Sequence, residues 1–180
     1  MPVSVGIMLP SRETAMTGLH DARGLIAFAR AAEDAGFDSV WVGDSLLART
    51  RAEPLSVLAA VAAVTTRVAL GTAALIAPLR HPLLVAAQAA TVDQLSAGRL
   101  ILGLGSGASL PESRREFDAV GMPFSGRGAR LDKTGHAVAR DMERARRIRR
   151  CTAAGATGRS AGLARWWRRD ESHRTRRGHL

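Results

Sequence analysis

Asp44 is the residue best placed for chemistry, because it directly follows a segment that reads as a buried strand. That strand is expected over residues 38–43, and the carboxylate comes immediately after it. A carboxylate next to a buried strand is costly unless it is paired or solvated. We therefore take Asp44 as the first candidate for a site residue, and a loop or helix-cap aspartate is the alternative.

The glycine-rich segment 103–107 suggests a ligand-binding loop. A dinucleotide-binding fingerprint would need a sixth-position glycine followed directly by a helix, whereas Ala108 holds that position and Pro111 follows soon after. A dinucleotide loop is therefore not expected. Nor do His, Cys and carboxylate residues show metal-ligand spacing, and His81 before Pro82 is expected to shape a loop.

Strands and helices alternate along the residues that surround these candidates. Apolar runs typical of strands begin near residues 3, 38, 68 and 100, a step of one strand and one crossover helix. Helices are expected over 21–35, from Pro54 and from Pro82 to Gly98, since proline suits a first turn and glycine a helix end. The fold class is α/β. A doubly wound sheet and a (β/α)₈ barrel both fit, and a complete barrel needs about 250 residues.

The positive charge is concentrated at the end of the chain. Of the net charge of +10, residues 1–133 carry +1, and residues 134–180 carry +9. A basic tail with Trp166 and Trp167 raises the alternative of a binding protein that contacts nucleic acid non-specifically. Other aromatic residues are missing from the tail, so nucleic acid is not the expected partner. Within it, residues 136–150 have the spacing of an amphipathic helix.

Four motifs, in order along the chain, resemble the luciferase-like monooxygenases, which are flavin- or deazaflavin-dependent (β/α)₈ oxidoreductases. The motifs are Ala32–Asp44, Leu70–Thr72 with Pro78–Pro82, Thr91–Leu100 with Gly103–Gly107, and Glu116–Asp132. The resemblance covers residues 3–133. We therefore interpret 1–133 as the N-terminal half of such a barrel, about four βα units. Residues 134–180 are interpreted as an Arg-rich, irregular tail that is frameshifted or disordered, particularly over 151–180.

The resemblance implies a cofactor site at the carboxyl ends of the strands. FMN or coenzyme F420 would be the cofactor, and Asp44 would face its ring. Thr72, Ala73 and Ala74 would lie under the ring, near a non-proline cis peptide bond, and Gly105 and Ser106 would leave room for the cofactor. Many deazaflavin-dependent relatives have a histidine after the aspartate, whereas this chain has Ser45. Catalytic residues are not assigned.

The resemblance also implies partners and a compartment. A small-molecule substrate is expected, and the open edges of a half-barrel predict a homo-oligomer. No apolar run approaches the roughly 18 residues that span a bilayer, and no signal peptide is expected. The single cysteine, Cys151, fits a reducing cytoplasm. Because the second half of the barrel is missing, the prediction is a truncated and inactive form of such an oxidoreductase.

Overall fold

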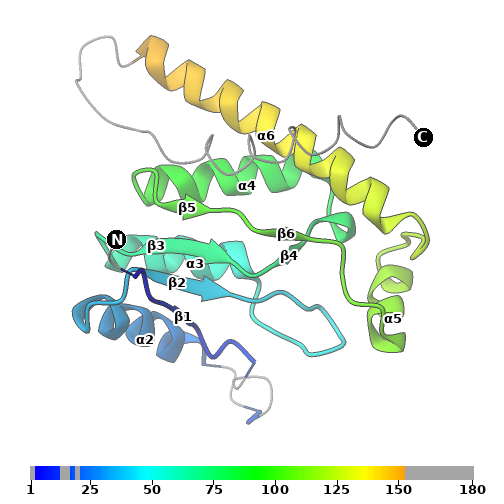
Figure 1. Ribbon diagram of the computed structural model, residues 1–180, viewed down its shortest axis with the longest axis horizontal. Helices are drawn as coiled ribbons and strands as arrows, with labels where there is room; N and C mark the ends of the chain where they lie inside the picture. Colours follow the sequence, from blue (N-terminus) through cyan, green and yellow to red (C-terminus); the bar gives the residue numbers. More distant parts are fainter. Residues whose placement is uncertain (1–2, 13–16, 19–20, 153–180) are drawn as a thin grey trace.

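The computed structural model describes residues 3–12, 17–18 and 21–152, with side chains as far as Glu143. Strands and helices alternate along the chain, and the helices pack beside the sheet (Figure 1). The strands are β1 (Gly6–Met8), β2 (Ser39–Val42), β3 (Ala69–Thr72), β4 (Leu75–Ile76), β5 (Leu100–Ile101) and β6 (Leu104–Gly105). The helices are α2 (Arg23–Asp34), α3 (Pro54–Val64), η1 (Ala77–Leu79), α4 (Pro82–Leu95), α5 (Pro111–Ala119) and α6 (Arg127–Thr152).

All described strand pairs are parallel, as the strand–helix alternation predicts. The main sheet has the order β1-β2-β3-β5, and β4 pairs with β6 in a second, short sheet. The register aligns Ile7 with Val40, and Leu70 with both Val40 and Leu100. This row is covered by the helices, and Val40 and Leu70 are fully buried. Together with the order of elements, this sheet is the arrangement of one part of a (β/α)₈ barrel.

Two strands that the sequence predicts as continuous are each interrupted. The predicted strand over 68–74 ends at Thr72 and resumes as β4, and the predicted strand over 100–104 is split into β5 and β6. Both breaks lie side by side, because Leu75 N–H donates to the carbonyl of Gly103 at 2.8 Å. The interruption bends both strands together, so the carboxyl end of the sheet is a separate two-stranded piece.

Proline residues set the starts of two helices, as expected. Pro54 begins α3 and Pro82 begins α4, each in the first turn. In α3 the side chain of Glu53 also accepts a hydrogen bond from Ser56 N–H at 2.7 Å, which satisfies one of the free amides of the helix end. These two helices pack against each other and on the sheet.

Helix α6 runs past residue 133, so the predicted tail, which begins at residue 134, is helical as far as Thr152 and not irregular there. Val138 and Met142 are buried in the main core, and α6 lies along α4 (Figure 1). The amphipathic helix predicted over 136–150 therefore lies inside α6, and its first apolar positions pack on the body. We predict disorder over residues 151–180. Of these, only Cys151 and Thr152, at the end of α6, are among the described residues. Trp166 and Trp167 lie outside the described residues.

Candidate functional site

The carboxyl end of the sheet presents a platform of small residues. Ala73 and Ala74 connect β3 to β4, and both are exposed although Thr72 before them and Leu75 after them are buried. The peptide bond between the two alanines is cis, at the position where the family resemblance places one. A Cβ atom on Gly105 would lie 3.2 Å from the Cβ of Ala74, so these two residues face each other closely. A flat ligand could approach the backbone here.

The hydroxyl of Thr72 joins the two strand breaks. It donates to the carbonyl of Gly103 at 2.7 Å and accepts from the N–H of Gly103 at 2.9 Å. A Cβ on Gly103 would lie 2.2 Å from the carbonyl oxygen of Thr72, so only glycine fits at this approach. Thr72 is 1% exposed. Its hydroxyl therefore supports the platform from within the fold.

Asp44 is an anchor of the same region. Its side chain is 2% exposed, and its carboxylate pairs with the guanidinium of Arg80 at 2.5 and 3.0 Å. It also accepts the N–H of Ile76 at 2.8 Å. The pairing explains how a carboxylate can stand directly after a buried strand: charge and lone pairs are satisfied by a bidentate arginine and a backbone amide. Asp44 thereby ties the end of β2 to β4 and to the start of α4.

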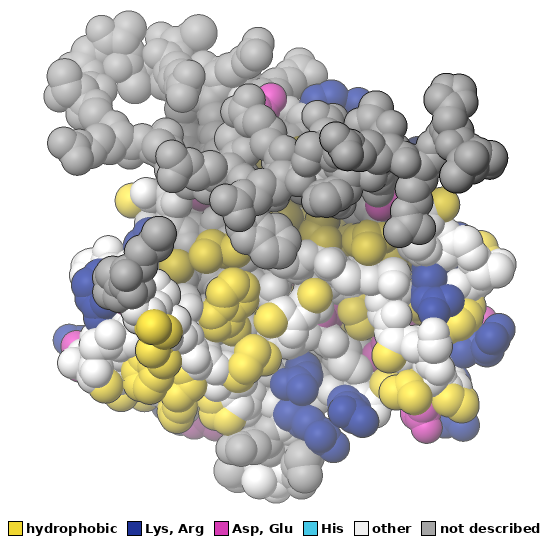
Figure 2. All heavy atoms as spheres, in the orientation of Figure 1, with side chains coloured by type: hydrophobic (Ala, Val, Ile, Leu, Met, Phe, Trp, Pro, Cys, Tyr) yellow, Lys and Arg dark blue, Asp and Glu magenta, His cyan; other side chains and the backbone are white. Residues whose placement is uncertain are grey.

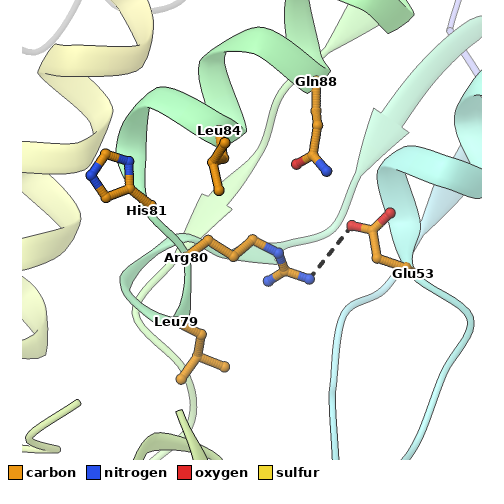
Figure 3. Close-up of a pocket in the computed structure, with 6 residues that line it drawn as sticks. All are labelled: Glu53, Leu79, Arg80, His81, Leu84 and Gln88. Atoms are coloured by element: carbon orange, nitrogen blue, oxygen red, sulfur yellow. Dashed lines mark ion pairs between the residues drawn. The ribbon is translucent and has the colours of Figure 1, made fainter. Parts of the chain in front are cut away.

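A pocket of about 300 Å³ lies beside this ion pair. It is lined by residues from the starts of α3 and α4 and from η1, namely Glu53, Leu79, Arg80, His81, Leu84 and Gln88. The Arg80 guanidinium reaches across it to Glu53 at 3.6 Å (Figure 3). Arg80 therefore joins two carboxylates, Asp44 and Glu53, at the rim of the sheet. The pocket combines one cation, one carboxylate and one imidazole with apolar walls.

A second buried carboxylate, Glu116 on α5, holds the loop that follows Asp44. One of its oxygens accepts from Ser45 Oγ at 2.8 Å and from the N–H groups of Leu47 and Ala48 at 2.9 and 3.0 Å. Burial acts to raise the pKa of Glu116, but these hydrogen bonds outweigh it, so the pKa lies below its ordinary value. Ser45, which directly follows Asp44 in the sequence, is thus engaged with Glu116.

The structure brings the predicted site residues to one end of the sheet. Ala74 contacts the space beside Gly105, Thr72 binds Gly103, and Asp44 binds the strand residue that pairs with Gly105. Ser106 follows directly and is half-buried. Sequence reasoning included Arg80 and Glu116 in the motifs of the resemblance but assigned neither a role in the site. The need of Asp44 for a partner was a signal for Arg80, whereas nothing in the sequence indicated that Glu116 would bind the loop after Asp44.

The part of the chain that the structure describes contains neither a metal-binding cluster nor a membrane-spanning helix. Across 3–12, 17–18 and 21–152, no cluster of three or more His, Cys, Asp or Glu side chains could hold a metal ion. Among the same residues, no helix combines the length and the apolar character that crossing a bilayer requires.

Comparison with known proteins agrees with the parallel α/β fold. The luciferase-like monooxygenase family matches residues 3–172, nearly the whole chain. The chain belongs to this family. The matched range continues beyond residue 133, in keeping with the continuous helix α6.

Individual relatives cover smaller parts. The F420-dependent glucose-6-phosphate dehydrogenase of Beutenbergia cavernae is 43% identical over 108 residues, which is 57% of this chain and 31% of the relative. The 5,10-methylenetetrahydromethanopterin reductase of Methanopyrus kandleri is 35% identical over 95 residues, 53% of this chain and 25% of the relative. A monooxygenase structure from Streptomyces bottropensis superposes with a TM-score of 0.65 and 30% identity, over 77% of this chain and 42% of that one. The chain therefore spans between a quarter and a half of these proteins.

Proposed function

We propose that this chain contributes the cofactor-binding platform of a cytoplasmic oxidoreductase that uses FMN or coenzyme F420 on a small-molecule substrate. The observation that carries the proposal is the exposed Ala73–Ala74 segment beside Gly105, at the carboxyl end of a parallel sheet. Two of the relatives are named for activities on small molecules, and one of those names includes the cofactor F420. When bound, the flavin or deazaflavin supplies the hydride-transfer chemistry.

The residues present fit a flat tricyclic ring. Two methyl groups and two glycines leave the backbone accessible, which is what close approach to a planar ring requires. Gly103 and Gly105 have no side chain on this side, and Ala73 and Ala74 project only a methyl group each. A larger side chain at Ala73 or Ala74 would occupy the space of the ring.

The buried carboxylates act as positioning residues in this proposal. Asp44 fixes Arg80 and the backbone of Ile76, and thereby the strand that pairs with Gly105. Glu116 fixes the loop over 45–48. Neither carboxylate is free to transfer a proton without losing several hydrogen bonds. We therefore expect a group other than Asp44 or Glu116 to donate a proton to the substrate.

The platform covers only one side of a ring, so the affinity of the described residues for the cofactor is expected to be weak. Ala73 and Ala74 are exposed, so the described residues around them leave the platform open. Pockets that bind cofactors tightly bury most of the ligand. We accordingly propose that the 180-residue chain has little oxidoreductase activity by itself and binds its cofactor in the micromolar range or more weakly.

Fluorescence titration with FMN and with coenzyme F420 tests the proposal. The Ala73→Glu variant places a charged side chain on the platform and is expected to abolish saturable binding. Ala63→Glu is the matched control, because Ala63 is equally exposed on α3 and lies away from the platform. Equal binding by the wild type and Ala73→Glu would refute the site. Failure of both cofactors to bind the wild type up to millimolar concentration would refute the proposed function.

A further inference from the structure

Within the part of the chain that the structure describes, one face of the main sheet carries no helix and no charged side chain. The register places two rows on it, Gly6–Ser39–Ala69 and Met8–Trp41–Gly71–Ile101. Met8 is 46% exposed and Ile101 is 42% exposed, and hydrophobic side chains gather over the region of β1, β2 and β3 (Figure 2). An uncharged sheet face of this kind marks an interaction surface. The opposite face is the one that the helices bury.

Both edges of the same sheet lack a described partner. The order β1-β2-β3-β5 leaves one side of β1 and one side of β5 unpaired within the described residues. On β1, Leu9 N–H donates to Trp41, and Val5 accepts from Asp38. Alternate residues of a strand point their amides to opposite sides, so the amides of Gly6 and Met8 point to the free edge. Unpaired edges invite pairing with another strand.

We propose that two copies of this chain close into one eight-stranded parallel barrel, with β5 of each copy beside β1 of the other. A two-fold axis along the barrel axis keeps every strand parallel, and it joins both pairs of free edges in one operation. Two sheets of four strands supply the eight strands of a (β/α)₈ barrel. The uncharged face then becomes the barrel interior.

A second copy fits this surface better than an unlike partner. No charged side chain lies in the two rows that could select a partner of opposite charge. The strands have the same direction and the same spacing on both sides of each new contact, because the two edges come from one sheet. The chain also covers 42% of a superposable relative, so two copies approach the size of one such protein. The inference is independent of the identity of the cofactor.

Light scattering and hydrogen exchange on the full 180-residue chain test the proposal. The expected mass is twice 19.1 kDa, falling toward one copy on dilution. In the dimer the amides of Gly6 and Met8 exchange slowly, and on dilution they exchange rapidly. Slow exchange at these two positions distinguishes edge-to-edge closure from stacking of sheet faces, which would leave both amides free.

Paired lysine variants locate the contact. Ile101→Lys puts a charge into the proposed interior and is expected to weaken the dimer at least tenfold. Leu83→Lys is the control, because Leu83 is 58% exposed on α4 and lies on the helical side. Circular dichroism checks that each variant is folded, and Met8→Lys replaces Ile101→Lys if the latter is not.

A monomer of 19.1 kDa throughout the micromolar range overturns the proposal. A dimer that Ile101→Lys and Met8→Lys leave intact, or in which Gly6 and Met8 exchange freely, also overturns it, because the copies would then meet elsewhere. If the chain forms a one-to-one complex only with a different polypeptide, a second copy is not the occupant. A dimer with slow edge amides, weakened by the interior lysine alone, supports it.

Discussion

The two ends of the sheet are built in different ways. At the amino end, the carboxylate of Glu33 accepts the N–H groups of Thr66, Arg67 and Val68, and Arg99 donates to the carbonyls of Ala62, Thr65, Val68 and Ser96. At the carboxyl end, two strands break, and small residues stand exposed between the breaks. Hydrogen bonds from long charged side chains thus stabilise the amino end of the sheet, whereas the backbone stays accessible at the carboxyl end. In barrels of this class the amino end serves stability and the carboxyl end serves chemistry.

The difference extends to the electrostatics. Burial lowers the pKa of Arg99, while the charge of Glu33 acts to raise it. For Glu33 the burial effect is outweighed by hydrogen bonds from Val68, Arg67 and Thr66 and by the charge of Arg99, so its pKa lies below the ordinary value. The charges of Glu33 and Arg99 at the amino end therefore each favour the ionised form of the other. At the carboxyl end, Asp44 and Arg80 form an ion pair at the rim, outside the platform.

The largest loss of stability is expected from Arg99→Met at the amino end. The variant keeps much of the side-chain volume but leaves several carbonyls without their donor, which is expected to cost about 3–5 kcal/mol. Urea unfolding measures this. Arg30→Met on the exposed face of α2 is the control, and a change of less than about 0.5 kcal/mol is expected there. A similarly small loss of unfolding free energy for Arg99→Met would show that Arg99 does not stabilise the amino end of the sheet.

Gly103→Ala is expected to have the next largest effect. The added Cβ would lie 2.2 Å from the carbonyl oxygen of Thr72, which is backbone and can move only with its strand. The loss is expected to be about 2–3 kcal/mol, as for overpacking. Gly128→Ala on α6 is the control, because a Cβ there meets no neighbour. Thermal unfolding of both variants gives the comparison, and an unchanged Gly103→Ala protein would contradict the close approach of the two strand breaks.

The Glu116→Gln variant tests how the carboxylate of Glu116 contributes to stability as a function of pH. Because the folded pKa of Glu116 is lowered, its contribution is present above the unfolded value near 4.5 and is lost as the pH falls through the folded value. The variant is expected to lose about 1–2 kcal/mol at neutral pH, since a neutral acceptor replaces a charged one. Below pH 4.5 the wild type should approach the variant. A difference between them that is constant with pH would exclude an ionised Glu116.

Ser106→Ala is expected to have the smallest effect on folding. The side chain is half-buried on the segment after β6, and removing its hydroxyl is expected to change the free energy of unfolding by less than about 0.5 kcal/mol. If the platform binds a cofactor, affinity should fall severalfold, the value of one hydrogen bond. A titration and a urea curve on the same sample separate the two quantities. A large loss of stability would show that Ser106 stabilises the fold, as Glu33 and Arg99 do.

Local patterns predicted much of the fold, because the responsible signals lie close together in the sequence. Pro54 and Pro82 mark the helix starts, and apolar runs mark the strands. The strand breaks were not predicted, since the chain stays apolar through Leu75 and Leu104 and the cause is a contact between two strands. The resemblance placed the predicted site residues at the carboxyl end of the sheet, and the structure has them there; their role stays a prediction. Arg80 could not be derived by spacing, because 36 residues separate it from Asp44.

The indole of Trp41 has an evolutionary consequence. It lies so close to Gly6 and Gly71 on the neighbouring strands that a Cβ would fall 2.6 Å from its Nε1 at Gly6 and 2.1 Å from its Cε3 at Gly71. No single substitution of either glycine is therefore compatible with the ring in this position. Gly71 and Trp41 are therefore expected to covary among relatives, because the three atoms nearest to a Cβ at Gly71 all belong to the ring. At Gly6 the Oγ of Ser39 would lie 2.4 Å from the Cβ, so a side chain there requires changes at both Ser39 and Trp41. A lineage can replace Gly71 only after a smaller residue has replaced the tryptophan.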